Sequence, residues 1–163
     1  MRTKTFMKSL LLSLALVPTM LFTSCATTDD GDYVEPIRLI EKIGGSWVLN
    51  TIVQTDETNA TEMTLTTLLG FDTFCLNLGE DGQFSVTGQA PQLLPTSGTW
   101  ELDNNFVKST GDATQLLLKG SEGTATLTVT ATPGAKAELG FQLTRKQGGQ
   151  PFVSYKYSLV SVQ

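Results

Sequence analysis

Apolar and polar residues alternate along most of the chain from residue 47 onward. The clearest case is the segment 125–131, where Ala, Leu, Val and Ala occupy every second position between threonines. A period of two with one apolar side is typical of antiparallel strands that bury a single face. In the segment 47–53, Trp47 and Val53 fall on one face and Ile52 on the other. The remaining alternating segments are 74–78, 84–86, 100–102, 137–143 and 153–159.

Short segments rich in Gly, Asn, Asp and Pro separate these predicted strands. Such residues favour tight turns, and short turns between successive strands indicate a meander in which sequence neighbours pair in the sheet. About eight strands with a single apolar face each must close into a barrel or fold into a sandwich. We expect an all-β fold, an antiparallel up-and-down β-barrel. The turn segments are 79–82, 103–105, 121–123, 133–134 and 147–149.

Two segments depart from the alternation and predict helices. Residues 36–43 predict a short helix, because Pro36 suits a first helical position and the glycine pair that follows provides a stop. Within it, Ile37 and Ile40 share a face. Residues 60–69 predict one or two further helical turns between the first and second strands, although four threonines dilute the helical pattern.

The first 24 residues have the order of a secretory signal peptide. Three basic residues precede the apolar run 10–17, and small residues follow at Thr23 and Ser24. This run is shorter than the about 20 apolar residues that span a bilayer. Removal of residues 1–24 leaves 139 residues (163 − 24), enough for one domain with its own core.

The segment Leu21-Phe22-Thr23-Ser24-Cys25 resembles the lipobox of bacterial lipoproteins in the relaxed form seen in Bacteroidetes. Phe22 stands where the strict motif has leucine. The resemblance implies that a diacylglyceryl group is attached to the Cys25 thiol and that cleavage makes Cys25 the first residue. Several acyl chains, at about 0.8 kcal/mol per buried CH₂, make such an attachment effectively permanent. The alternative is an ordinary secretory cleavage in which Cys25 has no role.

Residues 25–35 predict a lipidated cysteine followed by a flexible acidic tether. Residues 26–32 are small, polar and acidic, and therefore cannot bury an apolar face. Acidic residues directly after the cysteine also resemble the export signal for the outer face of the outer membrane, with a plain solvated tether as the alternative. We expect a lipid-anchored outer-membrane protein on the periplasmic or cell-surface side, with the barrel domain at 36–163.

The segment Gly45-Ser46-Trp47, after the predicted short helix and at the start of the first strand, resembles the G-x-W motif of lipocalins. This resemblance implies an eight-stranded barrel whose closed end is plugged by Trp47. It also implies that a late arginine, for which Arg145 is the candidate, packs across the indole with a cation–π energy of about 0.5–2 kcal/mol. The spacing recurs at Gly98-Thr99-Trp100 without a preceding helix. Together with the lipobox, the layout is similar to that of small lipocalin-like lipoproteins of Bacteroidetes.

Composition removes several classes of function. The chain has no histidine, which excludes Ser-His-Asp and Cys-His catalysis and histidine-ligated metals. Without residues 1–24 it carries eight basic and 16 acidic side chains, a net charge of −8 with no basic cluster, which argues against nucleic acid. The adjacent carboxylates Asp56-Glu57 and Glu80-Asp81 lie in turns, where side chains diverge. We expect no enzyme activity, no cofactor and no metal site.

Aromatic residues on the apolar faces of strands are either core or the lining of a cavity. We take Trp100, Phe141, Tyr155 and Tyr157 as candidate ligand contacts. The expected function is binding of a small apolar molecule, or an accessory role at the cell surface. One alternative is a carbohydrate-binding module of a glycan-uptake system with exposed aromatics, and another is a structural or inhibitory interaction protein whose barrel interior is filled.

Overall fold

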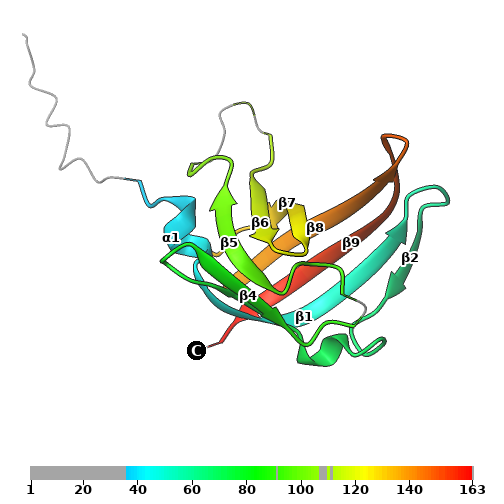
Figure 1. Ribbon diagram of the computed structural model, residues 1–163, viewed down its shortest axis with the longest axis horizontal. Coiled ribbons are helices and arrows are strands. Elements are labelled where there is room, and N and C mark those ends of the chain that lie inside the picture. The colour runs from blue at the N-terminus through cyan, green and yellow to red at the C-terminus, as the bar shows by residue number, and fades with distance from the viewer. Residues whose placement is uncertain (1–35, 91, 107–109, 111, 163) are drawn as a thin grey trace, which may run out of the picture. The chain divides into compact units, whose positions relative to one another are not determined.

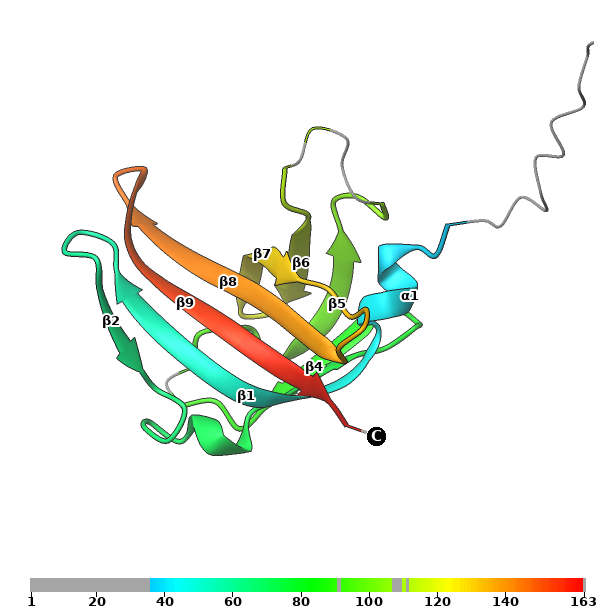
Figure 2. The same ribbon diagram turned by 180° about the vertical axis from the view of Figure 1, so that it is seen from behind.

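A closed barrel of antiparallel strands dominates the computed structural model, which describes residues 36–90, 92–106, 110 and 112–162 (Figures 1 and 2). No helix in these ranges is long and apolar enough to cross a membrane. The expected signal peptide, the lipidation of Cys25 and the tether lie outside the described residues. The elements are α1 (Leu39–Ile43), β1 (Gly45–Asp56), β2 (Thr61–Thr64), the 3₁₀ helix η1 (Phe71–Thr73), β3 (Cys75–Leu78), β4 (Gln83–Thr87), β5 (Ser97–Leu102), β6 (Gln115–Gly120), β7 (Gly123–Ala131), β8 (Glu138–Gln147) and β9 (Gln150–Ser161).

Each strand of the sheet pairs with the next one along the chain, from β3 to β9, and β9 returns to pair with β1. The other edge of β1 pairs with β3 over its first residues and with the additional strand β2 over its last ones. The ring therefore consists of β1 and β3 to β9, eight strands in all. This confirms the predicted all-β, up-and-down antiparallel barrel, an architecture consistent with a lipocalin-like fold.

A β-bulge in β1 changes which of its side chains face the interior. The register with β9 shifts between Leu49 and Thr51, so one extra residue, Asn50, enters the strand. An extra residue inverts the alternation beyond it. Ile52 is consequently 0% exposed, whereas Val53 is only half-buried. The prediction that Val53 shares the buried face of Trp47 is therefore wrong.

The predicted N-terminal helix is present but shorter than its sequence pattern indicated. α1 begins at Leu39, and Leu39 and Ile43 are its buried residues. Ile37 precedes the helix and is 63% exposed, so it does not share the packed face, whereas Ile40 is half-buried and packs against the core cluster. The N–H of Leu39 donates to the carbonyl of Asn105 at 2.8 Å, which ties the helix to the connection between β5 and β6.

The helix predicted over residues 60–69 is wrong, because this segment contains β2 followed by turns. Threonine is β-branched and fits a strand better than a helix. The segment also bonds outward to β1: the Ile52 N–H donates to Thr66 Oγ1 at 3.1 Å, and the Leu65 N–H donates to the Ile52 carbonyl at 2.9 Å. Leu65 is buried, which places an apolar anchor at the point where the chain leaves β2.

The two ends of the barrel differ in what covers them. At the end we call the closed end, α1 lies beside the start of β1 and the turn between β3 and β4 (Figure 1). At the opposite end, the mouth, lie the β8–β9 hairpin turn, the turn between β6 and β7, and residues 92–96, which we call the mouth loop. The β1–β2 and β8–β9 hairpins extend furthest in this direction (Figure 2).

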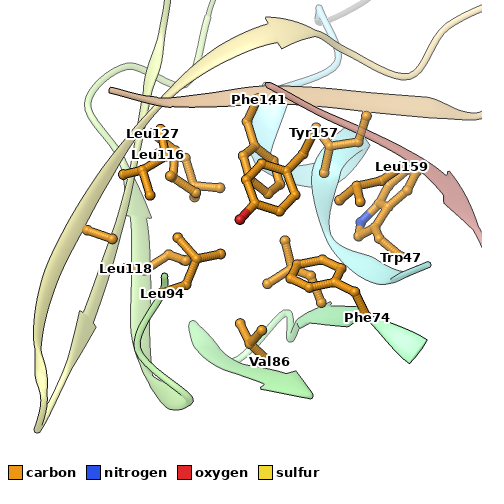
Figure 3. Packing of buried hydrophobic residues seen from close by; sticks show 14 of the residues in the cluster. Trp47, Phe74, Val86, Leu94, Leu116, Leu118, Leu127, Phe141, Tyr157 and Leu159 are labelled. Atoms are coloured by element: carbon orange, nitrogen blue, oxygen red, sulfur yellow. The ribbon is translucent and has the colours of Figure 1, made fainter. Parts of the chain in front are cut away.

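Apolar side chains fill the space enclosed by the ring (Figure 3). The cluster draws on every strand of the barrel, on α1 and on the mouth loop. Three rings pack together within it: the centroids of Phe141 and Tyr157 are 4.6 Å apart in a stacked arrangement, and those of Phe74 and Tyr157 are 5.4 Å apart. Such offset aromatic contacts contribute roughly 0.5–1.5 kcal/mol beyond area burial.

Replacement of Trp47 by phenylalanine tests how the closed end is held. The indole N–H of this buried residue donates to the carbonyl of Ile43, the last residue of α1, at 2.9 Å. Because the substitution leaves that acceptor without its donor, we expect the free energy of unfolding to fall by about 1–3 kcal/mol in urea titrations. Val48→Ala, on the outer face of the same strand, is the control and should change it by less than about 1 kcal/mol. Equal stability of Trp47→Phe and the wild type would contradict this account.

Candidate functional site

Trp47 and Arg145 lie at opposite ends of the barrel. Trp47 pairs with Ser161 near the start of β1, whereas Arg145 pairs with Val153, which in turn pairs with Asp56 at the end of β1. Nine steps of strand, about 30 Å at roughly 3.3 Å each, separate these two positions. The expected packing of Arg145 across the indole is therefore wrong, since the strand register carries the arginine to the mouth.

Gly45 opens β1 at the closed end with a backbone φ of +125°. A Cβ at this position would have no atom within 4 Å, so space does not require glycine here. The positive φ is what requires glycine, because residues with an L side chain rarely adopt such a backbone conformation. The glycine of the G-x-W motif thus sets the direction in which the chain leaves α1 and enters the barrel.

Trp100 does not reach the mouth. Its side chain is buried, and its indole N–H donates to the carbonyl of Gly79 at 2.9 Å, in the turn between β3 and β4. That turn belongs to the closed end. Both tryptophans therefore donate to backbone carbonyls on the same side of the barrel, and the structure separates Trp100 from the other candidate ligand contacts.

Phe141, Tyr155 and Tyr157 come together on β8 and β9. Phe141 and Tyr157 are partners in the strand register and are both 0% exposed. Tyr155 lies two residues nearer the mouth, is half-buried and packs against the core cluster. The structure thus brings three of the four predicted ligand contacts into one row that leads from the barrel centre toward the mouth.

The hydroxyl of Tyr157 is buried without a hydrogen-bond partner among the described residues. Burial raises the pKa of this hydroxyl, the neighbouring Tyr155 raises it further, and the Arg145 guanidinium opposes both effects. A buried polar group without a partner costs about 1–3 kcal/mol relative to a satisfied one. Such groups are rare in folded proteins and point to a water, an ion or a ligand that meets them.

A cleft of about 380 Å³ opens at the mouth. Ligand pockets in proteins usually have volumes of about 300–1,000 Å³. Leu93, Leu94 and Ala125 supply apolar surface, while Glu122 and Arg145 supply charge. The lining residues are Gln92, Leu93, Leu94, Pro95, Glu122, Gly123, Thr124, Ala125 and Arg145.

The two charged residues of the cleft have different roles. The Glu122 carboxylate accepts the backbone N–H and the Oγ1 hydroxyl of Thr96, both at 3.2 Å, and so holds the mouth loop against the β6–β7 turn. The exposed Arg145 makes no hydrogen bond or ion pair with any described residue. Its guanidinium, which presents a planar fork of donors, is therefore available for a carboxylate or phosphate.

The Gln89 side chain holds the backbone of the mouth loop at Leu93 and Leu94. Gln89 Oε1 accepts the N–H groups of Leu93 and Leu94, both at 3.2 Å, and Gln89 Nε2 donates to the Leu94 carbonyl at 2.9 Å. These bonds point the Leu94 side chain into the core cluster, where it is 3% exposed. Sequence reasoning missed the mouth loop; its only signal was an apolar Leu93-Leu94 pair in an otherwise polar connection.

The adjacent carboxylates Asp56 and Glu57 hold a turn together. Hydrogen bonds from the Asn59 side chain and from the backbone N–H groups of Thr58 and Asn59 lower the pKa of Asp56. Glu57 instead accepts the hydroxyl of Ser154 on β9. Within the described ranges, no group of three or more acidic or thiol side chains could hold a metal ion. At the mouth, by contrast, Arg145 supplies one positive charge and Leu93 and Leu94 supply apolar contact, which together suit a ligand with an acidic group.

Alkaline unfolding of Tyr157→Phe tests the burial of this hydroxyl. Because its pKa in the folded protein lies above the ordinary value of 10.0, the unfolded chain releases the proton first as the pH rises. The resulting contribution to stability is complete below about pH 10 and declines above it, by about 1.4 kcal/mol per pH unit. Between about pH 10 and 11.5 the unfolding free energy should fall more steeply in the wild type than in the variant. Parallel slopes would show that the hydroxyl titrates alike in both states.

Comparison with known proteins identifies the family but no characterised relative. No curated protein matches this chain significantly. A family model described as a domain of unknown function, DUF5004, matches residues 22–160. This range includes α1, the strands β1 to β8 and nearly all of β9, together with every residue that lines the mouth cleft. The chain therefore belongs to the DUF5004 family.

Proposed function

We propose that this protein is a non-catalytic binding protein that holds a small amphiphilic acid in the mouth cleft. The observation that carries the proposal is the guanidinium of Arg145, which pairs with none of the described residues, beside the apolar side chains of Leu93 and Leu94. An acidic head group would bind the guanidinium, and an apolar body would cover the leucines. Small-molecule sites combine apolar surface with a few placed polar groups, and this mostly polar cleft offers a small apolar area beside one guanidinium.

The alternative of a glycan-binding module has less support from the described residues. Stacking on sugars needs exposed aromatic rings, and both tryptophans are buried with their indole N–H groups bonded inside the protein. The exposed aromatics that the structure describes, Phe106 and Phe152, lie on different parts of the chain, before β6 and within β9.

An interaction protein is the second candidate, and a specific surface favours it. Met63, Leu68 and Leu69 are about half exposed and lie within one short stretch from β2 to the turns after it. Apolar side chains fill the barrel interior, as expected of a protein that binds its partner on the outer surface. Exposed apolar side chains that are close together often mark contacts with other proteins.

The proposal includes a lipid anchor on Cys25, supported by the signal-like residues 1–24, the lipobox-like segment ending at Cys25 and the acidic residues after it. Anchored in this way, the barrel would face the periplasm or the cell exterior at the outer membrane. Mass spectrometry of the protein from a lipoprotein-processing host should show a mass increase for acylation, which Cys25→Ser should abolish. A wild-type mass equal to that of the unmodified chain would refute the anchor.

Binding of octanoate tests the ligand site. The purified chain should carry Cys25→Ser, so that no attached acyl chain competes for the cleft. We expect octanoate to shift the NMR signals of the mouth loop and of β7 in a saturable way. Arg145→Gln should weaken octanoate binding about 5-fold, the effect of one partly exposed charge pair, and should leave binding of uncharged octanol unchanged.

Lys146→Gln is the matched control for this measurement. It removes a positive charge from the next residue of β8, which does not line the cleft, and should therefore leave the octanoate affinity as in the unsubstituted protein. Loss of affinity in both variants would indicate attraction to net charge alone. Absence of saturable shifts at the mouth in the unsubstituted protein would refute the proposed site.

A further inference from the structure

We infer that Leu94 is a displaceable plug, and that the Tyr157 hydroxyl beneath it is a deeper contact for a neutral oxygen atom of a ligand. The inference rests on the proposed function, since it extends the mouth cleft inward. It assigns the site two levels. Arg145 would bind an acidic group at the surface, and Tyr157 would hydrogen-bond a carbonyl, ether or hydroxyl oxygen inside the barrel.

Leu94 stands at the boundary between the cleft and the barrel centre, as does the smaller Ala125. It lines the cleft and also belongs to the buried cluster that contains Tyr157. Figure 3 shows the Tyr157 oxygen turned toward the side of the cluster where Leu94 and Leu118 lie. Outward movement of the Leu94 side chain would therefore open a path from the cleft toward the hydroxyl.

The bonds that hold Leu94 in place can be released without unpairing a strand. Its backbone is tied to the Gln89 side chain, and the adjacent end of the mouth loop is tied to Glu122 through Thr96. Leu94 itself lies outside β4 and β5. Side-chain hydrogen bonds of this kind each contribute modestly to stability, and bonds to a ligand can replace them.

The surroundings of the Tyr157 hydroxyl select the chemistry of its partner. Phe74, Phe141, Leu116 and Leu118 are all 0–1% exposed, so the hydroxyl has an apolar environment from which water is excluded. Loss of hydration there costs a charged group far more than a neutral oxygen, and the hydrogen bond from the hydroxyl compensates the neutral oxygen. The deep contact is therefore suited to the neutral oxygen of an otherwise apolar molecule.

A pair of isosteric probes tests this inference. Cyclohexanone carries a carbonyl oxygen where methylenecyclohexane carries a CH₂ group, and the two molecules are otherwise alike in shape. Leu94→Ala should admit both probes to the barrel centre, as cavities made in apolar cores admit small apolar molecules. Their affinities are measured by NMR titration in Leu94→Ala and in Leu94→Ala combined with Tyr157→Phe. We expect the ketone-to-alkene affinity ratio to fall about 3- to 10-fold when the hydroxyl is removed.

Leu93→Ala provides the matched control. Leu93 precedes Leu94, lines the same cleft and only packs against the edge of the core cluster. In Leu93→Ala, the ketone-to-alkene affinity ratio should be the same with and without Tyr157→Phe. If Leu94→Ala is too unstable to purify, Leu94→Val supplies a smaller opening for the same comparison.

The outcomes separate this inference from the proposed function. A ratio that Tyr157→Phe leaves unchanged in the Leu94 variants, or a lack of probe binding in them, overturns the deep contact even if octanoate binds at Arg145. A ratio that falls as expected supports the deep contact even if octanoate fails to bind, in which case only the acidic specificity of the mouth is wrong. An equal fall in Leu93→Ala would contradict the role of Leu94 as the plug.

Discussion

Pairing between β1 and β9 closes the sheet, and every other feature of the barrel depends on it. The register runs from Trp47 with Ser161 to Asp56 with Val153, nearly the full length of both strands. Closure pairs the edges of the eight ring strands and creates an inside in which apolar side chains from all eight meet. It also defines the two ends of the barrel. The first residues of β1 bring α1 to the closed end, while the β6–β7 and β8–β9 turns lie at the mouth.

The alternation of apolar and polar residues was sufficient to predict the fold class, because each strand buries one face and the turns between strands are short. It failed where a local interaction overrode it. Asn50 adds one residue to β1, and nothing in the composition around it marks the bulge. The threonines of residues 60–69 favoured a strand over the helix suggested by the leucine spacing. Arg145 was predicted to lie beside Trp47, and only the strand register shows that it lies at the other end of the barrel.

The two ends of the barrel have different chemistry. At the closed end, the indole N–H groups of Trp47 and Trp100 are both bonded to backbone carbonyls, so their polar atoms are fully used. At the mouth, polar atoms remain available: the Arg145 guanidinium has no protein partner among the described residues, and the Tyr157 hydroxyl lies unbonded further in. The buried Tyr157 hydroxyl lowers stability as long as it lacks a partner, whereas the exposed Arg145 guanidinium is hydrated; both lie toward the mouth, where we propose that a ligand binds.

The pairing of β1 with β9 also has a consequence for how the protein forms. Contacts between residues 97 to 114 positions apart lower the folding rate, because the intervening chain must lose its freedom before they are made. Until the last dozen residues have been synthesised, β1 and β8 each keep an unpaired edge that can join to another chain. A nascent or prematurely terminated molecule that lacks β9 is therefore prone to aggregate.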